Sequence, residues 1–212
     1  MRGLDEIGYS VYAAEAFQAR DHETLQAQPP SPDMGYYVTY EGFPELIEQA
    51  RGRGWTLLGY EVNKKDYPPD QLLIDQLIKP NVYTRREFSA ALKLAEFAEE
   101  NPEKLIFVHV GHAHLLKGNG RDLDENYKWD RVWLANMLQS NFGYEVLSVD
   151  QTNPENVRDR IHRCAVKRDE WRGNFLRVSK YEPNNGEFCA VYADYLIERL
   201  DEKYVCEDLS ET

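Results

Sequence analysis

Two histidines separated by one residue, His112 and His114, have the clearest capacity for chemistry in this sequence. They follow residues 105–110, an apolar run that is typical of a buried strand. Residues two apart in an extended segment point to the same side, so the two imidazoles could converge on a metal ion or a substrate. The alternative is that both are hydrogen-bonded loop residues. His109, inside the run, is interpreted as a hydrogen-bonded core histidine.

Acidic side chains follow the other apolar runs in the same way. In a parallel sheet the carboxyl ends of the strands share one edge, and ligands bind at that edge in open α/β sheets. Carboxylates that meet imidazoles there could bind a divalent metal or act as general acids and bases. The alternative is that acidic residues are common in loops, since this chain has 37 of them. The residues concerned are Glu15 after residues 8–14, Glu61 after residues 55–60 and Asp150 after residues 144–149.

The elements that position these residues alternate between strand and helix along the chain. This order predicts an α/β fold with a mostly parallel sheet flanked by helices and an antiparallel C-terminal strand. We expect one domain, residues 1–206, followed by a frayed tail, residues 207–212. Strands are predicted at residues 8–14, 55–60, 105–110, 144–149, 175–179 and 188–195. Helices are predicted at residues 43–53, 71–78, 84–100 with a capping box of Thr84 and Glu87, 127–141 and part of 153–171.

Two segments lie between these elements. Residues 18–33 contain three prolines and are predicted to be a surface loop. Residues 36–40 contain three tyrosines, which could line a pocket or could cover the sheet as part of the core.

Composition restricts the classes of partner. A formal net charge of -12 disfavours nucleic acid and anionic membrane surfaces, which leaves a small-molecule substrate or ligand. The three cysteines are widely spaced, so neither a zinc knuckle nor a disulfide framework is expected. The sequence contains neither an apolar run long enough to span a membrane nor a secretory signal. As written, the protein is expected in the cytoplasm; an additional N-terminal segment would change this expectation to export.

Several short motifs resemble one family of bacterial proteins. They are VHVGHAHL at residues 108–115, WLA at 133–135, SVDQT at 148–152, AAE at 13–15, GYY at 35–37, GYE at 59–61, and Arg86-Glu87. In this order they resemble an uncharacterised branch of the erythromycin-esterase-like and ChaN-like proteins, which share a superfamily with the TraB and Tiki proteins. The resemblance extends over about residues 5 to 155.

The resemblance implies an α/β fold whose active edge uses a histidine, acidic residues and an arginine. His114 matches the family histidine, Glu15 and Glu61 match its acids, and Arg86 matches its arginine. Relatives include esterases that open macrolides, metal-dependent proteases and haem-binding proteins. We therefore expect a hydrolase acting on an ester or amide, in which His114 is a base or ligand, the glutamates are ligands or acid–base groups, and Arg86 stabilises the transition state.

If a divalent metal assists the reaction, the expected ligands are His112, His114, Glu15 and Glu61.

Two alternatives to a hydrolase stay open. The first alternative is a non-catalytic protein that binds a small ligand, in its specific form haem held by His114 or a tyrosine. The second is a catalytically inactive remnant.

One departure from the family pattern favours these alternatives. Members usually begin with a strand that ends in a G-E-x-H-like motif, and no such motif precedes Glu15. The sequence therefore suggests a truncated chain in which residues 9–14 form a strand with an unpaired edge. Such an edge pairs readily with another chain, which predicts low stability or a homodimer. His112 is a speculative substitute for the missing histidine.

Overall fold

The computed structural model describes residues 2–19, 22–115, 133–152, 166–173, 176–181 and 195–199. Residue contacts divide the chain into two compact units, Met1–Gly111 and His112–Thr212, which are taken in turn. The first unit has the α/β architecture that the sequence predicts. Its helices are α1 (Arg2–Glu6), α2 (His22–Ala27), α3 (Phe43–Gly52), α4 (Asp70–Asp75) and α5 (Val82–Glu100), and its strands are β1 (Tyr9–Gln18), β2 (Thr56–Glu61) and β3 (Leu105–His109).

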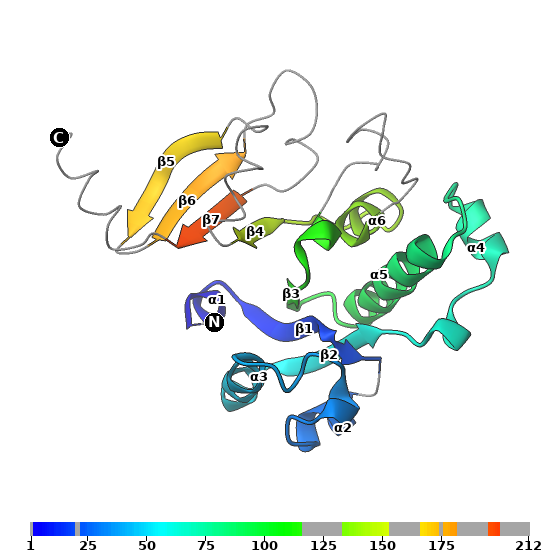
Figure 1. The fold of residues 1–212 in the computed structure, drawn as a ribbon, viewed down its shortest axis with the longest axis horizontal. Helices are drawn as coiled ribbons and strands as arrows, with labels where there is room; N and C mark the ends of the chain where they lie inside the picture. The colour runs from blue at the N-terminus through cyan, green and yellow to red at the C-terminus, as the bar shows by residue number, and fades with distance from the viewer. Residues whose placement is uncertain are drawn as a thin grey trace. The chain divides into compact units, whose positions relative to one another are not determined.

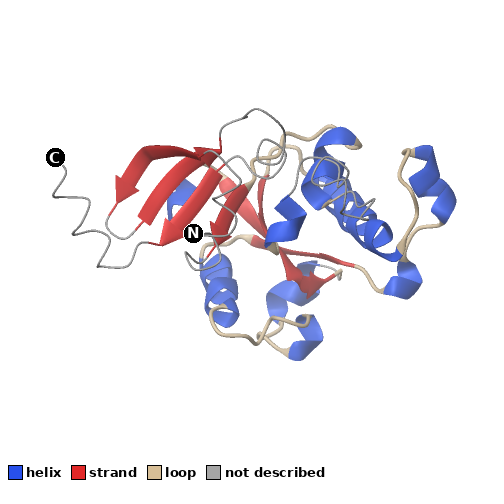
Figure 2. Cartoon of the chain, turned by 45° about the horizontal axis from the view of Figure 1, so that its top comes forward, coloured by secondary structure: helices blue, strands red, loops and turns tan. Residues whose placement is uncertain are grey.

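The strands of the first unit form a parallel sheet in the order β2-β1-β3. Figures 1 and 2 show α2 and α3 on one side of this sheet and α5 on the other. Helices on both faces explain why β1 is buried almost continuously instead of alternating between buried and exposed residues. Among the described residues, no helix has both the length and the apolar character to cross a membrane.

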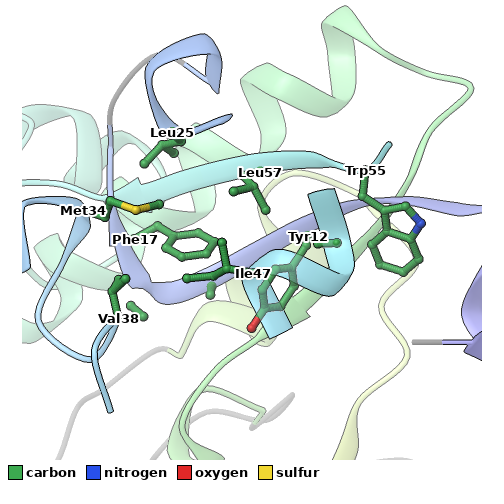
Figure 3. Close-up of a cluster of buried hydrophobic side chains, with 11 residues drawn as sticks. Tyr12, Phe17, Leu25, Met34, Val38, Ile47, Trp55 and Leu57 are labelled. Atoms are coloured by element: carbon green, nitrogen blue, oxygen red, sulfur yellow. The ribbon is translucent and has the colours of Figure 1, made fainter. Parts of the chain in front are cut away.

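One hydrophobic cluster fills the side of the sheet covered by α2 and α3. Tyr12 of β1 packs there with Leu25 of α2, Ile47 of α3 and Leu57 of β2 (Figure 3). Successive side chains of a strand point to opposite faces, so the buried Val11, which lies outside this cluster, faces α5.

The central position of β1 corrects an expectation. The sequence predicted a strand with an unpaired edge, but β1 pairs with β2 on one side and with β3 on the other. It is also longer than predicted, because it continues past Glu15 to Gln18. The unpaired edge on which the homodimer prediction depends is therefore not formed by β1.

Two local predictions for the first unit are also wrong. Residues 18–33 were expected to be a loop, yet α2 lies within them, because Leu25 is fully buried against the sheet. Helix α5 begins at Val82 instead of Thr84, because its N-cap is Asn81 and Thr84 is the third helical residue of the capping box. The predictions for α3, α4, β2 and β3 agree with the structure to within a few residues.

The second unit contains a different sheet. Its strand order is β4-β7-β6-β5, with β4 parallel to β7 and the other pairs antiparallel, as expected for the C-terminal region. Its elements are the 3-10 helix η3 (His112–Leu115), α6 (Leu134–Ser140), β4 (Val149–Thr152), β5 (Val166–Gly173), β6 (Leu176–Tyr181) and β7 (Tyr195–Arg199).

Two predictions for the second unit need correction. The strand expected at residues 144–149 begins only at Val149, so Asp150 lies inside β4 and not after a strand. Of the segment 153–171, expected to be helical in part, residues 166–171 belong to β5, and the remainder lies outside the described residues. The final strand begins at Tyr195. The expected tail, residues 207–212, and the first part of the helix predicted at 127–141 lie outside the described residues.

Candidate functional site

Two of the predicted acids meet the predicted arginine at one end of the parallel sheet. Arg86 of α5 donates from Nε to Glu61 Oε2 at 3.0 Å and from Nη2 to Glu61 Oε1 at 2.8 Å. The same Nη2 donates to Glu15 Oε1 at 2.7 Å, so one guanidinium joins β1, β2 and α5. The second oxygen of Glu15 accepts the backbone N–H of Gly111 at 2.9 Å. All three side chains are about two-thirds buried or more.

The start of α5 determines where Arg86 lies. The Asn81 side chain accepts the backbone N–H of Thr84 at 3.0 Å, and the hydroxyl of Thr84 accepts the N–H of Asn81 at 2.9 Å. The hydroxyl also donates to the carbonyl oxygen of Lys79 at 2.9 Å. This reciprocal cap satisfies N–H groups that a helix start leaves unpaired and so fixes where α5 begins, and α5 contacts β2.

Glu15 lies in a stretch of β1 where the pairing with β2 is irregular. Ala14 pairs with Gly59 and Gln18 pairs with Glu61, so β1 uses two more residues than β2 across this stretch. Irregularities of this kind bend a strand and redirect its side chains, and they are frequent next to active sites. Glu15 lies in this irregular stretch, between Ala14, which pairs with Gly59, and Gln18, which pairs with Glu61.

Two glycines leave room for this irregular stretch. A Cβ at Gly59 would overlap the backbone carbonyl oxygen of Gln18, and a Cβ at Gly35 would overlap that of Ala16. Only glycine permits such close approach of one backbone to another. The motifs at residues 13–15, 35–37 and 59–61 therefore meet at one place in the structure, together with Arg86.

A pocket of about 380 Å³ opens over these residues. Its wall is partly aromatic, since Tyr36 and Tyr37 line it, and this decides between the two interpretations of the tyrosine segment. The tyrosines are exposed because Met34 and Val38, on either side of them, are fully buried in the core (Figure 3). The pocket is lined by Glu15, Ala16, Gln18, Tyr36, Tyr37, Glu61, Val62, Asn63 and Arg86.

The electrostatics of the site favour a carboxyl that can exchange a proton. Burial raises the pKa of Glu61 above its usual value of 4.5; the hydrogen bond and charge of Arg86 oppose this rise, and the nearby carboxylates of Glu15 and Glu87 add to it. For Arg86, burial acts to lower the pKa, but the hydrogen bonds and charges of Glu61 and Glu15 outweigh burial and raise it. Arg86 is therefore a permanent cation, and Glu61 is the group that titrates.

Two residues to which the sequence analysis assigned no role act on this site. Tyr60 is almost completely buried, and its hydroxyl has no hydrogen-bond partner among the described residues. Its pKa is raised by burial and then by the charges of Glu15, Glu61 and Glu87. Glu87 is buried beside Arg86 on α5. Both residues stand in motifs of the family resemblance, GYE at residues 59–61 and Arg86-Glu87, but no role at the site was assigned to them. The signal that would assign one is burial next to other charges, which the sequence does not display.

The predicted histidines belong to different parts of the chain. His109 lies in β3, where its Nδ1 is 3.0 Å from the hydroxyl of Tyr12 and its ring stacks on Phe43 at 5.1 Å between centroids, as expected for a hydrogen-bonded core histidine. His112 and His114 both lie in η3 of the second unit. The ring of His114 packs edge-on against Trp133 at 5.8 Å. The side chain of His112 is outside the described part of the chain.

The predicted metal ligands do not assemble within what the structure describes. Among the described residues, no group of three or more His, Cys, Asp and Glu side chains could hold a metal ion. Of the predicted set, Glu15 and Glu61 hydrogen-bond to Arg86 instead. The guanidinium lies between the two carboxylates, where a divalent cation bound by both would have to lie. Metal binding by His112 and His114 stays a prediction.

Comparisons with known proteins add little to this geometry. No protein-family model matches the sequence, and no curated protein matches it. Among solved structures, the chain is similar to the crystal structure of RRSP, a MARTX toxin effector domain from Vibrio vulnificus CMCP6, with 19% identity and a TM-score of 0.37. The match covers 57% of this chain and 24% of the toxin chain, so this chain spans only a small part of that protein.

Proposed function

We propose that the pocket of Glu15, Glu61 and Arg86 is the active site of a hydrolase that acts on an ester or an amide. The observation that carries the proposal is the state of Arg86. Its Nε and Nη2 are held by two carboxylates, while its Nη1 donates no hydrogen bond to any described residue, and the side chain lines the pocket. A fixed, permanently charged side chain that lines a pocket is suited to stabilise the oxyanion of acyl transfer.

Glu61 supplies the acid–base chemistry in this proposal. Its ionised carboxylate removes a proton from water, and the water oxygen forms a bond to the carbonyl carbon. The carbonyl electron pair moves onto oxygen, which accepts from Nη1 of Arg86. The pair then returns, the bond to the leaving alcohol or amine breaks, and the leaving group takes the proton from Glu61. Glu15 holds Arg86 in position, and Gly111 holds Glu15.

The arrangement of the motifs supports a relationship with the erythromycin-esterase-like and ChaN-like proteins. The residues that carry the resemblance in the first unit meet at the pocket, as expected for a shared active edge. His114 as a base or ligand stays a prediction, as does a divalent metal held by His112, His114, Glu15 and Glu61.

The test is an assay of the purified chain against p-nitrophenyl esters of increasing acyl length and against a quenched-fluorescent peptide mixture. We expect Glu61→Gln to lower kcat/KM by about 10²- to 10⁴-fold, as for the loss of a general base. Glu48→Gln is the matched control, since Glu48 is an exposed glutamate of α3 that pairs with Arg51 and does not line the pocket. Hydrolysis that is unchanged in Glu61→Gln, or absent for every substrate, contradicts the proposal.

A second candidate function is that of a non-catalytic protein that binds a small ligand. The way in which Arg86 is hydrogen-bonded favours it. Arg86 is held by both carboxylates in a bidentate and shared arrangement, which is typical of a rigid binding site as well as of a catalytic one. In the specific form of this candidate, the ligand is haem held by His114 or a tyrosine. A titration with haem, followed by the Soret band in the parent protein and in His114→Ala, tests that version directly.

A further inference from the structure

The three tyrosines beside the pocket form an exposed aromatic surface. The ring centroids of Tyr36 and Tyr37 are 4.9 Å apart, those of Tyr37 and Tyr40 are 5.4 Å apart, and both pairs are edge-to-face. Tyr36 is 75% exposed, Tyr40 51% and Tyr37 40%. Burial of such a surface against a ligand is favourable, and monomeric proteins leave few apolar surfaces of this kind uncovered without a function. We call these three residues the tyrosine patch.

The tyrosine patch is held in place by the fold. Gly35 lies directly against the backbone of Ala16, and Met34 and Val38 are fully buried. The backbone of the segment is therefore fixed on both sides of Tyr36 and Tyr37. A patch that is positioned in advance loses little conformational entropy when a ligand binds.

Negative charge predominates among the pocket residues beside the tyrosine patch. With both carboxylates ionised, Glu15 and Glu61 outnumber the single cation of the pocket, Arg86, and Glu87 adds a further negative charge behind them. Lys64 and Lys65 follow the pocket residue Asn63, but both are exposed and neither lines the pocket. The faces of aromatic rings are themselves electron-rich. The aromatic wall and the carboxylates therefore attract the same kind of group.

We infer that this pocket recognises an organic ammonium group, carried on the substrate and seated between the tyrosine patch and the carboxylates. Alkylated ammonium groups combine an apolar surface with a positive charge, and they bind over aromatic rings through cation–π attraction. The inference deepens the proposed function, since it names the group on the substrate that the same pocket holds. It rests on that proposal only for the reaction that follows binding.

The probe is choline, measured by titration calorimetry and by ligand-observed NMR, with 3,3-dimethyl-1-butanol as its uncharged isostere. We expect choline to bind and the isostere to bind at least about tenfold more weakly, because only choline gains cation–π and charge attraction. Tyr36→Leu should weaken choline binding by about tenfold, and Tyr36→Phe should preserve it. Because Tyr36 is so exposed, both variants are expected to fold, and circular dichroism verifies this.

Four results would overturn the inference. They are no choline binding to the parent protein, equal binding of the isostere, equal binding by Tyr36→Leu, or tighter binding of acetate than of choline, which would show that Arg86 selects anions. Because the readout is binding without turnover, the two proposals fail separately. Choline binding without hydrolysis leaves the inference standing and removes the reaction, whereas hydrolysis without choline binding does the reverse.

Discussion

Arg86 donates two parallel hydrogen bonds to the carboxylate of Glu61, from Nε at 3.0 Å and from Nη2 at 2.8 Å. This fork-to-fork geometry fits the planar guanidinium and no other cationic side chain. Because Nη2 also reaches Glu15, one residue of α5 pairs with carboxylates from two strands. The stability of the first unit and the chemistry of its pocket therefore depend on the same side chain.

Arg86→Lys is expected to lower the free energy of unfolding by about 1–3 kcal/mol. Lysine keeps the charge but cannot make the fork, so at least one carboxylate loses its partner in a partly buried site. Chemical denaturation monitored by circular dichroism measures the change. The control is Arg85→Lys on the same helix: Arg85 pairs with Asp70 at the surface, so its replacement should cost less than about 1 kcal/mol. Equal losses in the two variants would show that the fork contributes nothing.

The pH dependence of hydrolysis should report on Glu61. Burial raises its pKa above 4.5, and the base of the proposed reaction is its ionised form. Activity should therefore rise with pH through an apparent pKa higher than that of an ordinary glutamate. The measurement is kcat/KM between pH 4 and 8 in the parent protein and in Glu61→Gln. A profile with the same acidic limb in both proteins would assign that limb to another group.

The stability of the protein should fall on mild acidification because of His109. Burial lowers its pKa below 6.5, although the charge of Glu15 opposes the shift. The Tyr12 hydroxyl lies 3.0 Å from Nδ1 of His109, so the neutral imidazole has a hydrogen-bond partner at this position. The unfolded chain then binds more protons than the folded one, and stability is lost as the pH falls from about 6.5 toward the lowered pKa.

Urea unfolding at pH 7.5 and pH 5.5 measures this effect. The parent protein should lose more stability between the two values than His109→Gln, which has no proton to take up at this position. The other histidines are present in both proteins, so their contributions cancel in the comparison. An equal loss in both proteins would mean that His109 does not carry the dependence.

Gly59→Ala is expected to destabilise the protein by about 3 kcal/mol, at the upper end of the range for overpacking. The reason is that the new methyl group would meet the backbone of β1 at Gln18 and not a side chain that can move away. Gly52→Ala at the end of α3 is the control, because nothing lies near its Cβ position, and its effect should stay within about 1 kcal/mol. Thermal unfolding compares the two. A mild effect at Gly59 would show that β1 can shift.

The sequence predicted the elements whose pattern is local. Strand β2 is a short apolar run bounded by charge, and α3 has a proline at its start, so both could be recognised without tertiary information. The meeting of Glu15 and Glu61 followed from a general property of parallel sheets, which requires only that both strands be identified. The fold class and the acidic part of the site were therefore accessible.

The remaining features depend on packing that the sequence does not display. Helix α2 forms among prolines because Leu25 has a place in the core. Two overlapping capping boxes can be read at the start of α5, Asn81 with Thr84 and Thr84 with Glu87. The structure has the first of them, in which the Thr84 hydroxyl also donates to the carbonyl oxygen of Lys79. The proton-exchange properties of Glu61 depend on Glu87 and on burial, which only the folded chain creates.

The central position of β1 has a consequence for how the protein forms during synthesis. Tyr9–Gln18 is synthesised before both strands that pair with it, and one of them, Leu105–His109, follows almost ninety residues later. At typical rates of translation, one edge of this apolar strand waits on the order of 5–20 s for its partner to leave the ribosome. Pairings between such distant segments also close slowly. The newly made chain is therefore vulnerable to aggregation in that interval, and a slower ribosome or an absent chaperone should reduce the yield of the protein more than its final stability would suggest.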